Sequence, residues 1–173
     1  MIEKRPVVTL FDSASANGAI ARQDDNAGYL TDINFTWWLD LCMKEGAMVW
    51  GRRTHEIYAP SMASSLRGPA CFVLTSNANF KVGQGWRVAT SPAEAVKMAA
   101  SASARGLVVS GGSSVNTAFV KAGLVDRVII NFEAILVGDG KPMFSPDKFE
   151  LPLQLRGVER LTETVVQLRY DVI

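Results

Sequence analysis

The sequence predicts an α/β protein with a mostly parallel central sheet, helices on both faces of that sheet and an antiparallel C-terminal edge. Short apolar runs alternate with helical segments over about 130 residues, and two runs of alternating apolar and polar residues then close the chain. The chain contains neither an internal repeat nor a linker-like stretch, which predicts a single domain over residues 1–173.

Six short apolar, β-rich runs are typical of buried strands. They lie at residues 7–11, 47–50, 71–74, 86–88, 107–109 and 125–132. Small and turn-forming residues at 13–18 predict a turn after the first run, and a polar loop is expected at 22–26. Helical segments separate most of the runs, so the strands are expected to pair in parallel.

The strongest helix signal is an apolar face with helical spacing. This face comprises Phe35, Trp38, Leu39, Cys42 and Met43. Thr31, Asp32 or Asn34 can cap the start of this helix, and Gly46 is well placed to end it.

Three further helices follow from local signals. A helical stretch over 54–58 is expected to stop at Pro60, because proline removes a backbone donor. Ser91 and Glu94 form a capping box with Pro92 at the first helical position, which predicts a helix to about residue 104. A helix over about 114–122 is expected to end at Gly123.

The last part of the chain reads as a β-hairpin. Its apolar positions are Leu153, Leu155 and Val158 in one strand and Val166, Leu168 and Tyr170 in the other. Alternation of this kind predicts that one face of the hairpin is buried and the other wet.

Composition excludes several classes of protein. Lys and Arg total 18 against 17 Asp and Glu, with no basic block, so nothing indicates a nucleic-acid partner. Cys42 and Cys71 lack metal-ligand spacing, and we expect no metal site. The first ten residues lack the apolar core of a signal peptide, and no apolar run is long enough to span a membrane. A cytoplasmic location is the default expectation.

Unusual residues follow three of the predicted strands. The three groups are Gly51, Arg52, Arg53 and Thr54; Thr75, Ser76 and Asn77; and Gly111, Gly112, Ser113 and Ser114. Glycines let the backbone approach an anion, a helix N-terminus offers free N–H groups, and arginines add charge. Each group alone is weak evidence, but ligands bind beyond the carboxyl ends of strands in such sheets. The three groups together predict one phosphate-binding groove.

Several stretches resemble a known family. Residues 48–56, Met-Val-Trp-Gly-Arg-Arg-Thr-His-Glu, resemble the strand-to-helix segment of dihydrofolate reductases, and residues 108–112 resemble their second glycine turn. Residues 15–21, 123–129 and 136–144 are similar to the C-terminal reductase domain of the riboflavin-pathway enzyme RibD. The resemblance spans about 7–144 with the motif spacing preserved. It implies the dihydrofolate-reductase-like three-layer fold, NADPH as hydride donor and a homodimer.

The resemblance also implies a role for each group. Gly51, Arg52, Arg53 and Thr54 would hold the pyrophosphate and the adenosine side, and Thr75, Ser76 and Asn77 would lie near the ribose and its 2′-phosphate. Gly111, Gly112, Ser113 and Ser114 would lie under the pyrophosphate, and Asn17, Gly18 and Ala21 would border the nicotinamide.

The chain departs from the family where an acid is expected. Dihydrofolate reductases place a carboxylate near the position of Phe35, which helical spacing assigns to the core. Asp32 is the nearest catalytic candidate, with a helix N-cap as its alternative role; Asp12 and Asp40 are weaker candidates. Residues 57–67 match the RibD substrate segment poorly, and the zinc deaminase signature is absent.

Three aromatic or basic side chains complete the candidates. Trp37 lies off the apolar helix face and either lines the substrate cleft or packs at the surface. The only histidine, His55, is expected on a helix surface rather than in contact with the cofactor, and Tyr29 is expected to be structural rather than a proton donor.

Together these patterns predict an NADPH-dependent reductase that transfers hydride to a small pyrimidine- or pterin-like substrate. One alternative is a nucleotide-binding protein of the same fold without turnover, and another is a flavin-linked or purely structural dimer.

Overall fold

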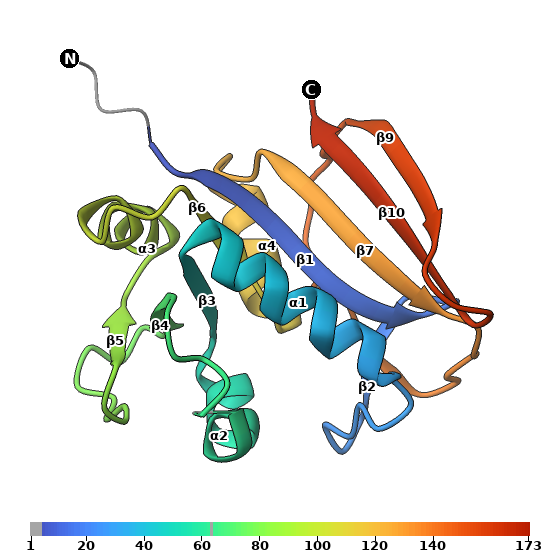
Figure 1. The fold of residues 1–173 in the computed structure, drawn as a ribbon, viewed down its shortest axis with the longest axis horizontal. Coiled ribbons are helices and arrows are strands. Elements are labelled where there is room, and N and C mark those ends of the chain that lie inside the picture. The colour runs from blue at the N-terminus through green and yellow to red at the C-terminus, as the bar shows by residue number, and fades with distance from the viewer. Residues whose placement is uncertain (1–4, 63) are drawn as a thin grey trace.

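A computed structural model describes residues 5–62 and 64–173 and is built around one eight-stranded sheet. The strand order is β5-β4-β3-β6-β1-β7-β10-β9 (Figure 1). The strands are β1 (Val7–Ser15), β3 (Ala47–Gly51), β4 (Ala70–Leu74), β5 (Trp86–Ala89), β6 (Gly106–Val109), β7 (Arg127–Glu133), β9 (Leu153–Arg160) and β10 (Val165–Val172). The six neighbouring strands β5, β4, β3, β6, β1 and β7 pair in parallel. Strand β10 pairs antiparallel with both β7 and β9. The predicted parallel sheet with an antiparallel C-terminal edge is therefore confirmed.

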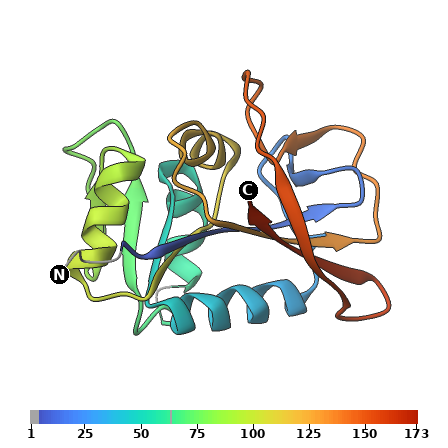
Figure 2. The same ribbon diagram turned by 90° about the horizontal axis from the view of Figure 1, so that it is seen from above.

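The four helices of the described chain cover both faces of the sheet. They are α1 (Asp32–Glu45), α2 (Arg52–Met62), α3 (Pro92–Ser101) and α4 (Ser113–Lys121). Figure 2 shows α1 and α4 on opposite faces of the sheet. Each face has its own apolar cluster: one includes Trp38, Leu41 and Cys42 of α1, and the other includes Ala95 of α3 and Phe119 of α4. The predicted three layers, helix on sheet on helix, are confirmed.

A second, two-stranded sheet stands beside the main one. It pairs β2 (Ala19–Arg22) with β8 (Gly140–Pro142) in antiparallel fashion. The residues expected to form a turn at 13–18 are instead partly strand, because β1 continues to Ser15 and pairs there with Glu133 of β7. Tertiary pairing along β7 overrides the local turn preference of these small residues.

Helix α1 begins and ends as expected, but its buried face is rotated. Gly46 caps the C-terminus in the left-handed conformation, with φ of 87°. The residues that are buried are Asn34, Trp38, Leu41 and Cys42. Phe35 is 37% exposed and Met43 is 48% exposed, so their assignment to the core is wrong. One side of α1 faces a cleft rather than the sheet, which leaves Phe35 accessible.

Two other expectations are corrected. Helix α2 begins at Arg52 and runs through Pro60 to Met62, so the proline lies inside the helix instead of ending it. Strand β9 is not half-buried: Leu155 is 54% exposed and Val158 is 61% exposed. In β10 the fully buried positions are Val165 and Gln167. No helix covers the β9–β10 end of the sheet in Figure 2, which is why its apolar residues stay accessible.

No helix in the described ranges combines the length and apolar character required to cross a bilayer.

Candidate functional site

A deep cleft opens at the carboxyl ends of the central parallel strands. Its volume is about 1150 Å³, and its walls come from α2, the first turns of α1 and α4, and the two-stranded sheet. Backbone bonds hold the ends of β3 and β6 together, because the Gly51 N–H donates to Gly111 O at 2.9 Å and the Ser110 N–H donates to Val49 O at 2.9 Å. The turn with two arginines and the turn with two glycines are therefore neighbours, as one shared groove requires.

Most residues predicted to hold the cofactor line this cleft. They are Ala21, Gly51, Arg52, Arg53, Thr54, Thr75, Ser76, Gly111, Gly112, Ser113 and Ser114. Asn77 does not line it: its side chain accepts the Asn79 N–H at 3.0 Å and so stabilises the turn after β4. The convergence of the three strand ends is the central structural result.

Two glycines permit the close packing of this convergence. A Cβ at Gly51 would lie 3.0 Å from Cγ2 of Val115 in α4, so a side chain there would push α4 away from β3. Gly111 has φ of +69°, a left-handed conformation that L side chains rarely adopt. The backbone at these turns is thus left open toward the cleft.

The N-terminus of α4 points its free N–H groups at the same space. Its N-cap is Gly112, which has no side chain to satisfy them. Thr54 lies close by, with Oγ1 3.8 Å from the place of a Cβ on Gly112. The Ser113 hydroxyl, expected to serve a ligand, instead donates to the Pro142 carbonyl and ties α4 to β8. Backbone amides and hydroxyls such as that of Thr54 are suited to anion binding.

The basic side chains of the cleft differ in their partners. Arg53 donates to Asp25 at 2.6 Å, and Lys141 of β8 also pairs with Asp25. Hydrogen bonds from Arg53 and Lys141 lower the pKa of Asp25. Arg52 makes only a loose pair with Glu56, at 3.8 Å and largely exposed. Arg52 is thus the more available cation, and Arg53 helps to close one end of the cleft.

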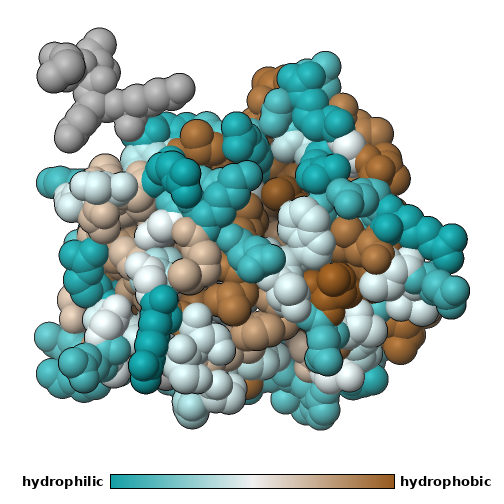
Figure 3. Space-filling model, in the orientation of Figure 1, coloured by the Kyte–Doolittle hydropathy of each residue, from teal (hydrophilic) through white to brown (hydrophobic). Residues whose placement is uncertain are grey.

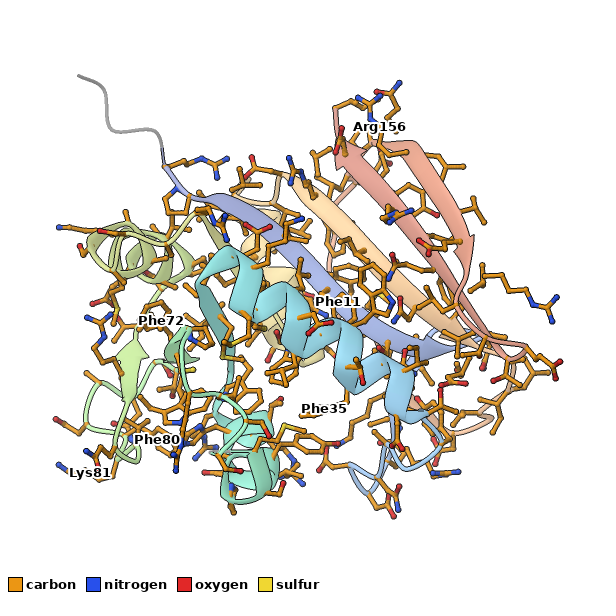
Figure 4. All side chains as sticks on the ribbon, viewed as in Figure 1. Phe11, Phe35, Phe72, Phe80, Lys81 and Arg156 are labelled. Carbon is orange, nitrogen blue, oxygen red and sulfur yellow. The ribbon has the colours of Figure 1, made fainter. Side chains whose placement is uncertain are left out.

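The side of α1 that faces the cleft carries the substrate candidates. Asp32 is exposed at the first turn and lines the cleft, as do Phe35 and Trp38. Figure 4 shows Phe35 on the side of α1 that faces α2. Trp37 does not line the cleft and packs against the apolar cluster under α1. Of its two predicted roles, the structure supports packing.

Two residues expected near the nicotinamide hold a loop instead. Neither Asn17 nor Gly18 lines the cleft. The Asn17 amide donates to Val137 O at 2.9 Å and accepts from the Val137 N–H at 3.0 Å, which ties the β1–β2 turn to the segment before β8. Tyr29 donates its hydroxyl to the Ala19 carbonyl, in line with its structural assignment.

His55 is buried, so its placement on the helix surface is wrong. It is 8% exposed and packs edge-on against the ring of Trp86, with ring centroids 4.6 Å apart. Its Nδ1 accepts from Trp50 Nε1 at 3.2 Å, and burial lowers its pKa. The first turn of α2 directs this side chain inward because β5 and the loop before it cover that face.

A buried carboxylate at the start of α1 was not predicted, because no local pattern marks it. Glu133 at the end of β7 is 3% exposed. Its Oε1 accepts from the Thr31 N–H, the Thr31 hydroxyl and Asn34 Nδ2, each at 2.6 Å. This carboxylate holds the N-terminus of α1, and with it the cleft wall that carries Asp32 and Phe35.

Asp12, weighed above only as a weaker acid, occupies a central position. It lies in β1 and lines the cleft. Asn116 of α4 donates to its Oδ2. Burial raises its pKa from the ordinary 3.8 to about 7, and the Asn116 hydrogen bond opposes this rise. Local sequence patterns could not distinguish Asp12 from the other acidic candidates, because its partner Asn116 lies 104 residues away.

The residues present fit a dinucleotide. A Cβ at Gly111 would lie 3.4 Å from Asp12 Oδ1, the α4 N-terminus lacks a side-chain cap, and the exposed Arg52 is only loosely paired with Glu56. The cleft volume of about 1150 Å³ exceeds the roughly 300–1,000 Å³ typical of one small-ligand site, so a cofactor and a substrate can share it.

Comparison with known proteins gives a consistent result. The sequence model of the RibD C-terminal domain matches residues 6–167. An uncharacterized Bacillus subtilis protein, YyaP, is 33% identical over 60 residues, which is 35% of this chain and 32% of that protein. The matched stretch thus spans about a third of the curated relative.

Two solved structures show the same fold. A putative riboflavin biosynthesis protein from Shewanella has a TM-score of 0.80 at 19% identity, covering 96% of this chain and 99% of that one. A diaminohydroxyphosphoribosylaminopyrimidine deaminase/5-amino-6-(5-phosphoribosylamino)uracil reductase from Thermotoga maritima has a TM-score of 0.78 at 17% identity. That comparison covers 99% of this chain and 58% of the bacterial enzyme.

Proposed function

The chain belongs to the RibD C-terminal domain family, and from that premise we propose that it is an NADPH-dependent reductase of a small pyrimidine- or pterin-like heterocycle. The observation that carries the proposal is the meeting of three strand ends in one cleft. Gly111 and the N-terminus of α4 offer backbone N–H groups there, and Arg52 offers an exposed cation. This combination suits the two phosphates of a dinucleotide.

The cofactor supplies a hydride, and the protein positions the two reactants. Gly111, Gly112 and Thr54 would hold the pyrophosphate, while Thr75, Ser76 and Arg52 would meet the ribose with its 2′-phosphate. The charge of that phosphate is the reason for proposing NADPH over NADH, because Arg52 at this end of the cleft is exposed and only loosely paired, with Glu56 at 3.8 Å. The remaining space beside α1 would hold the heterocycle.

The substrate class rests on the relatives and on the shape of the cleft. The Thermotoga relative is named as a reductase of a phosphoribosylaminouracil, a pyrimidine. In this chain Phe35 and Trp38 provide flat apolar surfaces beside polar groups, which suits an aromatic ring with hydrogen-bonding edges. Residues 57–67 differ from the family segment for the ribityl phosphate, so we propose the ring class rather than the phosphorylated sugar.

A binding and turnover experiment tests the proposal. Trp38 and Trp50 lie at the cleft, so cofactor binding should quench tryptophan fluorescence. We expect micromolar binding of NADPH, weaker binding of NADH, and loss of this preference in Arg52→Gln. Glu56→Gln, which removes the loose partner of Arg52, is the matched control and should keep the preference. Absence of NADPH binding would overturn the proposal.

Turnover separates a reductase from a binding protein of the same fold. NADPH oxidation is followed by the absorbance of the reduced nicotinamide, with a panel of aminopyrimidines, their ribosyl phosphates and dihydropterins. Oxidation with at least one ring compound is expected. Tight NADPH binding without oxidation across the panel would favour the alternative function.

We also propose that the chain forms a homodimer through the β9–β10 end of the sheet. β9 is the edge strand, and its apolar side chains Leu155 and Val158 are more than half exposed. Figure 3 shows apolar side chains at the surface over this end of the molecule. A second copy can cover both the apolar side chains and the unpaired strand edge. Analytical ultracentrifugation should show a dimer for wild type. Val158→Lys should convert it to a monomer, whereas the control Glu163→Lys, at an exposed position, should leave it a dimer. A monomeric wild type would refute this proposal.

A further inference from the structure

Asp12 lies in the middle of the sheet, on β1, and lines the cleft. Its strand β1 pairs with β6 on one side and with β7 on the other. Val8 and Leu10, which share its side of the strand, belong to the apolar cluster under α3 and α4. Asp12 therefore continues a fully apolar row and is its one ionisable member, at the point where the row reaches the cleft.

The contacts of Asp12 leave one carboxyl oxygen toward the glycine turn. Asn116 Nδ2 donates to Oδ2 of Asp12 and also to the Met143 carbonyl at 2.8 Å. Because both of these partners are acceptors, the orientation of the Asn116 amide is determined. The other oxygen, Oδ1, lies 3.4 Å from the place of a Cβ on Gly111. A glycine at that position keeps the carboxyl open to a ligand that lies over the turn.

No charged side chain neutralises Asp12 within the described chain. The effects on its pKa are burial, which raises it, and the Asn116 hydrogen bond, which lowers it. The neighbours of Asp12 are Gly111 in the turn after β6, Ile130 in β7 and Tyr29 in the loop before α1. The pKa of Tyr29 is itself raised, mainly by burial and in part by the charge of Asp12. Two cations that line the cleft, Arg53 and Lys141, are paired with Asp25.

We infer that Asp12 holds the proton that accompanies hydride transfer in this protein, and that Asp32 does not. This inference rests on the proposed function. The reduced nicotinamide gives a hydride to the carbon of a C=N or C=O bond in the heterocycle. The O–H bond of Asp12 breaks as an N–H or O–H bond forms on the substrate, so the substrate is reduced and the carboxylate remains. That carboxylate would then offset the positive charge that an oxidised nicotinamide carries.

Asp12 differs from Asp32 in the property that this role requires. Asp32 is exposed at the start of α1, where water surrounds its carboxylate. Asp12 is partly buried, shares a hydrogen bond with a neutral amide, and lies next to the turn that would carry the cofactor. A carboxyl that is protonated near neutral pH can both donate a proton and then stabilise a cation.

The inference predicts a coupling between Asp12 and the charge of the cofactor. NADP⁺ should favour ionised Asp12, whereas NADPH should favour the protonated form. The ratio of the NADP⁺ and NADPH dissociation constants should therefore fall about tenfold or more between pH 6 and pH 8, since an opposite charge within a few ångströms shifts a pKa by one unit or more. Binding of NADP⁺ at pH 7 should also release a proton.

The experiment measures both dissociation constants by tryptophan fluorescence across this pH range, without turnover. Wild type, Asp12→Asn and Asp32→Asn are compared, with exposed Asp40→Asn, outside the cleft, as the matched control. Only Asp12→Asn should abolish the pH dependence of the ratio. Proton release by wild type in weak buffer gives a second readout that needs no variant.

The outcomes separate the inference from the function on which it rests. Failure of wild type to bind either nucleotide overturns the proposed function. Binding of both with a pH-independent ratio and no proton release overturns the inference about Asp12 alone. Loss of the pH dependence in Asp32→Asn, with retention in Asp12→Asn, would assign the proton to Asp32 and also overturn it.

Discussion

Stability as a function of pH provides a test of Asp12 that involves no ligand. Burial gives Asp12 a pKa of about 7 in the folded protein, against an ordinary 3.8. Between these values the folded state keeps a proton that the unfolded chain has lost. The free energy of unfolding therefore decreases as pH rises from about 4 to 7, and the contribution of protonated Asp12 is fully present only below about 3.8.

The magnitude follows from the two pKa values. At about 1.4 kcal/mol per factor of ten, the rise from 3.8 to about 7 corresponds to about 4 kcal/mol. Partial exposure to the cleft screens the carboxylate, so we expect about 2–4 kcal/mol. Asparagine cannot ionise and keeps an oxygen that can accept from Asn116. Asp12→Asn should thus be within about 1 kcal/mol of wild type near pH 4 and more stable by about 2–4 kcal/mol at pH 8.

Urea unfolding followed by tryptophan fluorescence at several pH values measures this difference. Asp40→Asn replaces an exposed carboxylate on α1 and is the matched control, which should differ from wild type only slightly. A constant gap between Asp12→Asn and wild type across the range, or a gap that widens toward acid, would refute the reasoning.

Three other perturbations test the walls of the cleft. Glu133→Ala removes three short hydrogen bonds to the start of α1 and should lower the free energy of unfolding in urea by about 3 kcal/mol. The control Glu163→Ala, at an exposed position, should lower it by less than about 0.5 kcal/mol, and equal losses would contradict this prediction. Gly111→Ala places a Cβ at φ of +69° and should lower the free energy of unfolding by about 1–2 kcal/mol. It should also weaken NADPH binding at least about tenfold, and unchanged binding would count against the glycine turn as a phosphate site. Asp25→Ala frees Arg53 and Lys141 and should tighten NADPH binding about threefold or more at low salt by fluorescence titration; weaker binding would show that the ion pair supports the site instead.

Local signals predicted most of the elements. Gly46 ends α1 in the left-handed conformation, and Ser91 with Pro92 begins α3, since both depend on a few adjacent residues. The apolar runs before Gly51 and Gly111 form β3 and β6 with bounds within one residue of those expected. The clustering of the strand ends could also be predicted, because parallel strands place their carboxyl ends at one edge of the sheet.

Side-chain environments were predicted less well. Phe35 was expected in the core but is exposed beside the cleft. His55 was expected at the surface but is buried against Phe80 and Trp86. Helical spacing defines a face but does not say what lies opposite it. The apolar residues of β9 show the same limit, because alternation could not reveal that this end of the sheet has no covering helix.

The order of elements, their caps and the glycine-containing turns at the strand ends follow from the sequence, because each depends on residues within a few positions of one another. Tertiary structure alone decided which carboxyl of the cleft is partly buried without a cationic partner. The partners of Asp12 and Glu133 lie about a hundred residues away, at Asn116 and at Asn34. A pKa depends on that assembled surrounding, so the acid of the cleft becomes visible only when β1, α4 and β7 are packed together.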